Sequence, residues 1–208
     1  MFYFTKTPFW LKKLYPSCLW NYPQVKGEKK IYLSFDDGPH ALATPFVLDQ
    51  LKKYNARASF FCIGKNVVEE TAIYKRILIE GHRVGNHTYN HMNGWKTDNK
   101  VYLDNIEKAR SLIDSDLFRP PYGRATAFQI RNLKEKLKYQ IVMWDVLSGD
   151  FDPKVSGEAA AERVIRKSRS GSIVVFHDST KAYQVLMVAL PMVLAYFSGQ
   201  GYSFETIK

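Results

Sequence analysis

Short apolar runs alternate along the chain with longer stretches in which apolar residues recur with helical spacing. The apolar runs, which we interpret as β-strands, cover residues 31–35, 58–63, 83–85, 117–119, 140–144, 172–177 and 202–207. The stretches that we interpret as helices cover residues 45–54, 66–80, 100–113, 126–137, 156–168 and 181–198. Strand–helix alternation of this kind predicts an α/β fold with about seven parallel strands and outer helices, as an open doubly wound sheet or a barrel.

The first 30 residues differ from this pattern. They are aromatic and basic, contain three prolines, and lack the continuous apolar run followed by small residues that is typical of a signal peptide. We interpret residues 1–30 as an extended strap over the domain, with a weak membrane-interface anchor as the alternative. The absence of a clean helical period favours the strap. Residues 31–208 contain no internal repeat or linker-like segment and are expected to form one domain.

Composition narrows the possible partners. The chain has 208 residues, 46% of them hydrophobic, and a formal net charge of +10. The hydrophobic content excludes a disordered chain, and the positive charge favours an anionic partner. Basic residues interleaved with aromatic ones, as in RNA-binding proteins, are missing, so we expect no nucleic-acid partner. Cys18 and Cys62 are too few for a disulfide framework, and the sequence leaves their pairing open.

Residues 182–204 carry no charged side chain and are long enough to cross a bilayer. Gln184, Pro191, Gly199 and Gly201 interrupt this stretch, so we interpret it as a buried helix followed by a turn and a last strand. We therefore expect no transmembrane segment, although peripheral membrane contact stays open. The compartment is also open on sequence grounds.

Unusual polar residues fall at the carboxyl ends of the predicted strands. Asp36 and Asp37 end the first strand, and a pair of histidines follows the third. The fourth strand ends at Arg119, Asp150 follows the fifth, and the sixth ends at His177. Parallel α/β folds build their sites at this edge of the sheet, so the distribution indicates an enzyme.

His87 and His91 are four positions apart, which places both on one face of a helical turn or helical loop. The neighbouring Asn86 and Asn90 also suit a solvated turn without a metal. Joined to one carboxylate of the aspartate pair, the histidines make a three-ligand set with an open position, as in catalytic zinc sites. The second carboxylate can then take a proton from the attacking water. We expect one divalent metal, Zn²⁺ first, with Co²⁺, Ni²⁺ and Fe²⁺ as alternatives.

Five motifs appear together in a defined order. They are SFDDGP at 34–39, HTYNH at 87–91, RPPYG at 119–123, DF at 150–151 after VLSG, and VFHD at 175–178. In order and spacing they resemble the motifs of the polysaccharide deacetylases, carbohydrate esterase family 4, also called the NodB homology domain. The resemblance runs from about residue 31 to the end of the chain. It implies a distorted, incomplete (β/α) barrel and a metal-dependent deacetylase.

The resemblance assigns roles to individual residues. It implies that Asp37, His87 and His91 hold the metal, and that Asp36 is the general base, kept ionised by Arg119.

The same resemblance implies that His177 is the general acid, oriented and raised in pKa by Asp150. The backbone N–H of Tyr122 is expected to stabilise the oxyanion. The residues expected to line the oxyanion site and substrate pocket are Tyr122, Pro121, Val175, Trp144 and Phe151.

Four positions depart from the motifs or have no role in them. Leu147 and Phe151 stand where many family members have Asp and Trp, and Ser34 stands where Thr is usual. We expect activity to survive these changes and the fit of the substrate to differ. His40 has no family role and is interpreted as a surface residue.

The implied function is removal of N-acetyl, or O-acetyl, groups from a carbohydrate polymer. The first candidate contains N-acetylglucosamine, as peptidoglycan and chitin do. The alternatives are a deformylase or deacylase of a lipid-linked sugar, and a carbohydrate-binding homologue without activity. The expected partner is an acetylated poly- or oligosaccharide, and the expected state is a monomer.

Overall fold

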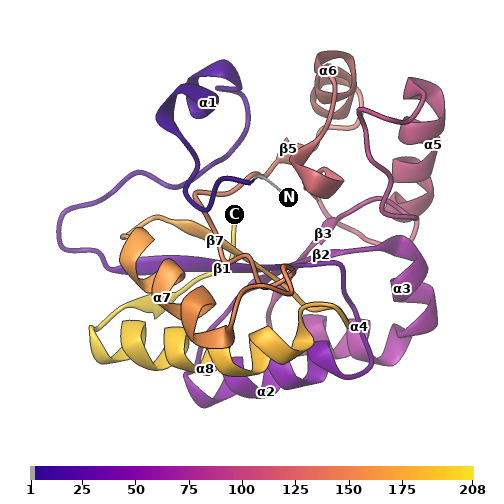
Figure 1. Ribbon diagram of the computed structural model, residues 1–208. Coiled ribbons are helices and arrows are strands. Elements are labelled where there is room, and N and C mark those ends of the chain that lie inside the picture. Colours follow the sequence, from indigo (N-terminus) through magenta and orange to yellow (C-terminus); the bar gives the residue numbers. More distant parts are fainter. Residues whose placement is uncertain (1–2) are drawn as a thin grey trace.

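The computed structural model describes residues 3–208 and shows a curved parallel sheet with helices around it (Figure 1). Seven parallel strands form a half-barrel in the order β5-β4-β3-β2-β1-β7-β6, and β8 pairs with the start of β1. The strands are β1 Lys30–Asp36, β2 Ser59–Cys62, β3 Arg83–Asn86, β4 Leu117–Phe118, β5 Gln140–Ile141, β6 Val146–Leu147, β7 Ile173–His177 and β8 Ser203–Phe204. The predicted incomplete (β/α) barrel is confirmed.

One strand prediction was wrong in detail. The apolar run 140–144 was expected to be a single strand, but β5 ends at Ile141 and a separate strand, β6, follows at Val146–Leu147. β5 pairs with β4, whereas β6 pairs with β7 on the other side of the sheet. The intervening residues therefore cross the open side of the half-barrel.

The helices follow the predicted alternation, with one division and one addition. They are α1 Phe9–Leu14, α2 Ala43–Lys53, α3 Gly64–Glu69, α4 Thr71–Ile79, α5 Asn99–Arg110, α6 Ala127–Glu135, α7 Gly157–Lys167 and α8 Tyr183–Gly199, with a 3₁₀ turn, η1, at Pro121–Gly123. The expected helix 66–80 is divided into α3 and α4 around Glu70. α3 buries Val67 and α4 buries Tyr74 and Ile77, whereas Val68, Leu78 and Ile79 are exposed.

Successive side chains of the central strand β1 point to opposite faces of the sheet. Ile31, Leu33 and Phe35 point outward into the main core, which α2, α7 and α8 complete on one side of the sheet (Figure 1). Ser34 and Asp36 alternate with them and point into the half-barrel. The last inward position of β1 is therefore available for chemistry.

The inner face of the sheet is closed by a second apolar cluster. It consists of Tyr32, Phe61, Leu117, Val142, Ile173 and Ile207. This cluster fills the floor of the half-barrel, below the carboxyl ends of the strands.

The N-terminal strap, which the structure describes from residue 3, lies across the open side of the half-barrel. It is not extended throughout, because Phe9–Leu14 forms the short helix α1. Lys6 makes an antiparallel bridge with Val146, and Leu19 makes a parallel bridge with Val142. The division of the chain at residue 30 stays a prediction.

A buried carboxylate fixes the strap. Asp145, 1% exposed, accepts hydrogen bonds from Lys6 Nζ and Lys12 Nζ, each at 2.6 Å, and from Ser172 Oγ at 2.6 Å. Burial alone would raise the pKa of Asp145, but these partners lower it. Removing either lysine would leave a buried charge with one partner fewer, which is a costly change.

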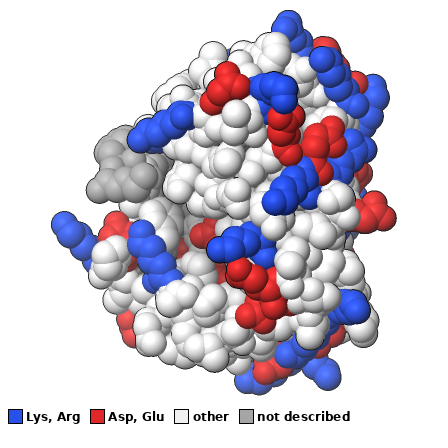
Figure 2. Space-filling model, turned by 90° about the vertical axis from the view of Figure 1, so that its right-hand side faces the viewer, with Lys and Arg blue, Asp and Glu red and all other residues white. Residues whose placement is uncertain are grey.

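Three other expectations concern the chain as a whole. Among the helices of residues 3–208, none has the length and apolar character needed to cross a bilayer. Cys18 and Cys62 are both buried free thiols in the described part of the chain. On the face shown in Figure 2, basic and acidic side chains are interspersed.

Candidate active site and metal centre

Arg119, the residue after β4, spans the inside of the half-barrel and is fully buried. Its Nη1 donates to Asp36 Oδ1 at 2.6 Å and to Ser34 Oγ at 2.9 Å. The rest of the guanidinium donates to the backbone oxygens of Val142 and Met143. Every edge of the planar group is thus used to hold one oxygen of the Asp36 carboxylate in a fixed place.

Asp36 and His177 are neighbours because β1 and β7 pair in that register. His177 Nδ1 donates to Asp150 Oδ1 at 2.8 Å, and the His177 backbone N–H donates to Asp150 Oδ2 at 2.7 Å. Ser148 Oγ donates to the same carboxylate at 2.9 Å. With Nδ1 held in this way, the Nε2 atom of His177 is left for the substrate.

The electrostatics of His177 favour the protonated ring. Burial alone would lower its pKa, but the charge and hydrogen bond of Asp150, with Asp37 and Asp36 nearby, raise it to about 9. At neutral pH the protonated form of the His177 ring is therefore favoured. Asp150 lies after β6, and not after the strand that the sequence analysis assigned to it.

Asp37, His87 and His91 present ligand atoms that all lie within 4.8 Å of one another. Asp37 Oδ1 is 3.1 Å from His91 Nε2 and 3.6 Å from His87 Nε2. His87 Nδ1 donates to the Arg119 carbonyl oxygen at 2.7 Å, so its Nε2 carries a lone pair toward the cluster. Burial lowers the pKa of His87 to about 4, which keeps the ring neutral.

These residues fit a divalent metal. Asp37 Oδ1 is buried and accepts no hydrogen bond of good geometry from residues 3–208. A buried carboxylate oxygen without a donor, facing two imidazole nitrogens, is the environment that a cation satisfies. Burial alone would raise the pKa of Asp37, but His91 and the charges of His177 and His87 lower it. The donor set is consistent with Zn²⁺ and with other transition metals.

The two histidines do not share a helical turn, so that prediction was wrong. They lie on an irregular loop after β3, in which Thr88 has φ +65° and His91 has φ +56°. Asn86 Oδ1 accepts from the Thr88 N–H at 2.8 Å, and Asn105 Oδ1 accepts from the N–H groups of Tyr89 and Asn90. The asparagine side chains replace the hydrogen bonds that a helix would supply.

The predicted pocket residues surround this centre. Tyr122 is half exposed at φ +61°, and its ring lies 4.7 Å from that of His91. The Phe151 ring lies 5.1 Å from that of His177. Tyr122, Trp144, Phe151 and Val175 all line one cavity with the metal cluster, whereas Pro121 is buried beside it and does not line it.

Several residues of the site were not identified from the sequence as positioning groups. Ser34 helps to hold Arg119, and Asn105 shapes the histidine loop. Asp178 is fully buried, accepts from the Gly38 N–H at 3.1 Å and from Thr44 Oγ1 at 2.5 Å, and so fixes the turn after Asp37.

His40 is also more than a surface residue. Its Nδ1 accepts from the backbone N–H groups of Leu42 and Ala43, so it caps the start of α2. The position of His40 directly after the SFDDGP motif, just before a predicted helix, could have indicated this cap, because side-chain acceptors are favoured before a helix.

Taken together, one cavity of the half-barrel holds a candidate divalent-metal centre, the buried carboxylate of Asp36 and a histidine whose protonated form is favoured. The family model for polysaccharide deacetylases matches residues 24–142. A peptidoglycan-N-acetylglucosamine deacetylase of Bacillus cereus is 33% identical over 203 residues, covering 95% of this chain and 95% of that protein. The chain belongs to the polysaccharide deacetylase family.

Other relatives set the limits of this comparison. The peptidoglycan-N-acetylglucosamine deacetylase PgdA of Listeria monocytogenes is 32% identical over 191 residues, which are 89% of this chain and 39% of that protein. The chain therefore spans well under half the length of that relative.

Two solved structures are informative. That of the Bc1960 peptidoglycan N-acetylglucosamine deacetylase with 4-naphthalen-1-yl-N-oxidanyl-benzamide has a TM-score of 0.87 and 31% identity, covering 97% of this chain and 95% of that one. That of a mutant of BA3943, a CE4 family pseudoenzyme with restored enzymatic activity, has a TM-score of 0.79 and 26% identity, covering 95% and 72%. Since the fold occurs in a pseudoenzyme, activity depends on the site residues.

Proposed function

We propose that this chain is a metal-dependent deacetylase that hydrolyses the N-acetyl group of N-acetylglucosamine in a glycan, with peptidoglycan as the first candidate. The observation that supports it best is the pairing of β1 with β7, which sets Asp36 and His177 next to each other in the cavity that also holds Asp37, His87 and His91. The names of the relatives favour peptidoglycan. The net charge of +10 suits an anionic polymer.

In this proposal, Asp37, His87 and His91 would hold a divalent ion, which would supply Lewis-acid chemistry for the attack of water on the acetyl carbonyl. Asp36 takes the proton of the attacking water. Arg119 occupies one oxygen of Asp36 and keeps the carboxylate oriented, so the other oxygen serves as the base.

His177 then delivers a proton to the leaving nitrogen. An amide nitrogen leaves only when it is protonated, so this step is essential for an N-acetyl substrate. Asp150 holds Nδ1 of His177 and leaves Nε2 to carry the transferred proton. The Tyr122 N–H, in a backbone conformation that is rare for a residue with a side chain, is assigned to the oxyanion.

The test is acetate release from acetylated oligomers of peptidoglycan, chitin and xylan, with and without a chelator. The proposal predicts chelator-sensitive release, greatest from the peptidoglycan oligomer. Asp36→Asn is the matched control, since it keeps the size of the side chain and removes the base. Release that is equal in the wild type and in Asp36→Asn would overturn the proposed mechanism. Binding of an oligomer without release in either protein would instead support the inactive carbohydrate-binding homologue.

A further inference from the structure

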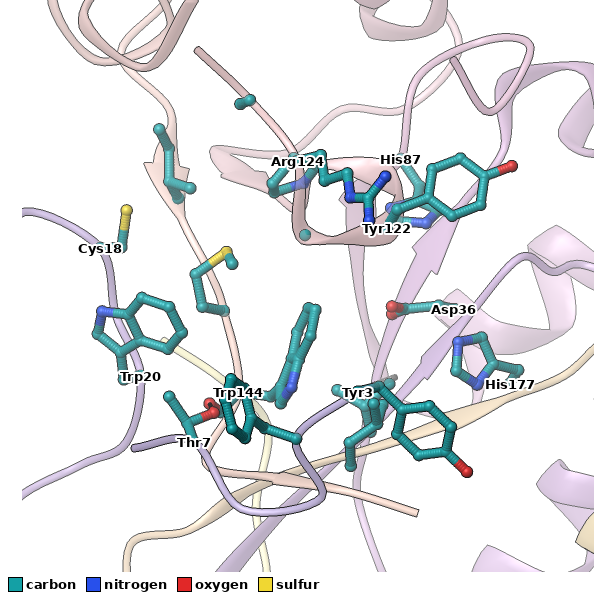
Figure 3. A pocket seen from close by; sticks show the side chains of 18 of the residues that line it. Tyr3, Thr7, Cys18, Trp20, Asp36, His87, Tyr122, Arg124, Trp144 and His177 are labelled. Atoms are coloured by element: carbon teal, nitrogen blue, oxygen red, sulfur yellow. Dashed lines mark hydrogen bonds between the residues drawn. The ribbon is translucent and has the colours of Figure 1, made fainter. Parts of the chain in front are cut away.

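The cavity that contains the metal cluster is much larger than an acetyl group needs. Its volume is about 700 Å³, within the range of about 300–1,000 Å³ that is usual for sites of drug-sized ligands. Its polar end contains Asp36, Asp37, His87, His91 and His177. Its other end, lined by Leu11, Leu14, Tyr15, Cys18, Trp20 and Met143, is apolar. In Figure 3 Cys18 and Trp20 lie across the cavity from Asp36 and His177, with Trp144 between them.

The apolar end offers few hydrogen-bonding groups to a sugar, since the Tyr15 hydroxyl and the Trp20 Nε1–H are the main polar groups among the residues just named. None of the side chains just named for it carries a charge. The Trp20 Nε1–H is already used, since it donates to the Tyr15 carbonyl at 3.0 Å. Burial raises the pKa of the Cys18 thiol to about 11, so it stays neutral. Several sugar hydroxyls placed there would lose hydrogen bonds to water that the Tyr15 hydroxyl alone could not replace, whereas hydrocarbon would be stabilised.

The wall of this end is held in place. Thr7 Oγ1 donates to the Trp144 carbonyl at 2.6 Å, and the Thr7 N–H donates to the Asp145 carbonyl at 2.9 Å. The Asp145 side chain binds Lys6 and Lys12 on either side of Thr7. The Trp144 ring packs closely against Gly123, where an added Cβ would lie 2.6 Å from the ring. The strap therefore forms a fixed wall of the cavity.

We propose that this apolar end, which we call the strap chamber, accepts an N-acyl chain longer than acetyl, so that the protein is an N-deacylase for apolar acyl groups on an amino sugar. The inference rests on the proposed function, because the same base and acid act on the amide. Water adds its oxygen to the acyl carbon, the C–N bond breaks, and the nitrogen receives a proton. The products are a carboxylate, whose chain lies in the strap chamber, and a free amine.

The size of the effect follows from burial. Each methylene removed from water is worth about a fourfold gain in binding, the equivalent of about 0.8 kcal/mol. Replacing acetyl by butanoyl adds two methylenes, so kcat/KM should rise by about fifteenfold. The kcat/KM for the hexanoyl substrate should be higher still, provided that the chain fits in the strap chamber.

The first experiment compares kcat/KM for glucosamine oligomers that carry N-acetyl, N-butanoyl or N-hexanoyl groups. The wild type should prefer the longer chains. Cys18→Phe fills the strap chamber and should reduce the hexanoyl-to-acetyl ratio by tenfold or more. Cys18→Ala, which leaves the chamber open, should keep the ratio. Trp10→Ala, at an exposed position of α1 that does not line the cavity, should leave both rates unchanged.

The second experiment needs neither turnover nor a variant. Calorimetry on the metal-loaded wild type should show tighter binding of hexanoate than of acetate, by about tenfold or more. If no oligomer is hydrolysed but hexanoate still binds more tightly, the strap chamber is supported and the proposed function fails. If N-acetyl groups are hydrolysed while longer chains give no gain in either experiment, the proposed function holds and the inference is overturned.

Discussion

Replacing Asp150 by Asn is the most informative test of the proposed proton donor, His177, because Asp150 is its charged partner. In the wild type, burial opposes protonation of His177, yet Asp150 and the other carboxylates raise its pKa to about 9. Against an ordinary value of about 6.5, this corresponds to about 3 kcal/mol in favour of the charged ring. Asn keeps the shape of the carboxylate and removes its charge. A nearby opposite charge typically shifts a pKa by about 1–3. The pKa of His177 should therefore fall by about that amount when the Asp150 charge is removed.

The sign of the effect on stability follows from the same shift. Because the folded-state pKa of His177 is raised, its contribution to the free energy of unfolding is fully present below about pH 6.5. It is lost as the pH rises through about 9. At pH 6.5 Asp150→Asn should be less stable than the wild type, because His177 lacks its buried charged partner. Between pH 6.5 and pH 9 the free energy of unfolding of the wild type should fall by up to about 3 kcal/mol relative to that of Asp150→Asn.

The assay is an NMR titration of the His177 ring carbon in chelator-treated protein, with urea unfolding at pH 6 and pH 9.5. Ser148→Ala is the control, because it removes one neutral hydrogen bond from Asp150 and leaves the charge. It should move the pKa of His177 much less than Asp150→Asn does. An unchanged titration of His177 in Asp150→Asn would refute the argument that Asp150 sets the charge of the ring.

Three further predictions concern the metal and the two ends of the proton path. His87→Ala and His91→Ala should each lose the metal, and stoichiometric metal in both purified variants would contradict the assignment. Asp36→Asn should keep the metal and lose about 10²–10⁴-fold in turnover; a near-normal rate in the metal-loaded variant would make Asp36 structural. His177→Ala should abolish N-deacetylation and spare some activity on an activated aryl acetate, whose leaving group needs no proton; equal losses on both would point to a role in shaping the pocket.

The sequence was sufficient for the elements whose signal is local. β1 and β7 are continuous apolar runs with an inward polar residue at the end, and that alternation decides which residues reach the site. Asp36 and His177 could be placed at one edge because parallel strands share a direction. The short strand Val146–Leu147 could not be separated from the run before it, because two residues carry no periodicity.

Other features depend on contacts between distant segments. The helix α1 has six residues, and its formation depends on packing of the strap, not on intrinsic helix propensity. The pairing of Lys6 and Lys12 with Asp145 is invisible in a sequence, since nothing local to Asp145 indicates its partners. The same holds for Asn105, which shapes the histidine loop from another helix.

The register of β1 against β7 also has a consequence for folding. All three candidate metal ligands belong to the first 91 residues, but His177 arrives near the end of the 208-residue chain. During synthesis, β1 has its partner β2 early and must wait for β7 on its other side. Contacts of such long range make folding slow, and an edge that waits unpaired is prone to aggregation. The nascent chain thus contains the complete ligand set long before it contains the proton donor.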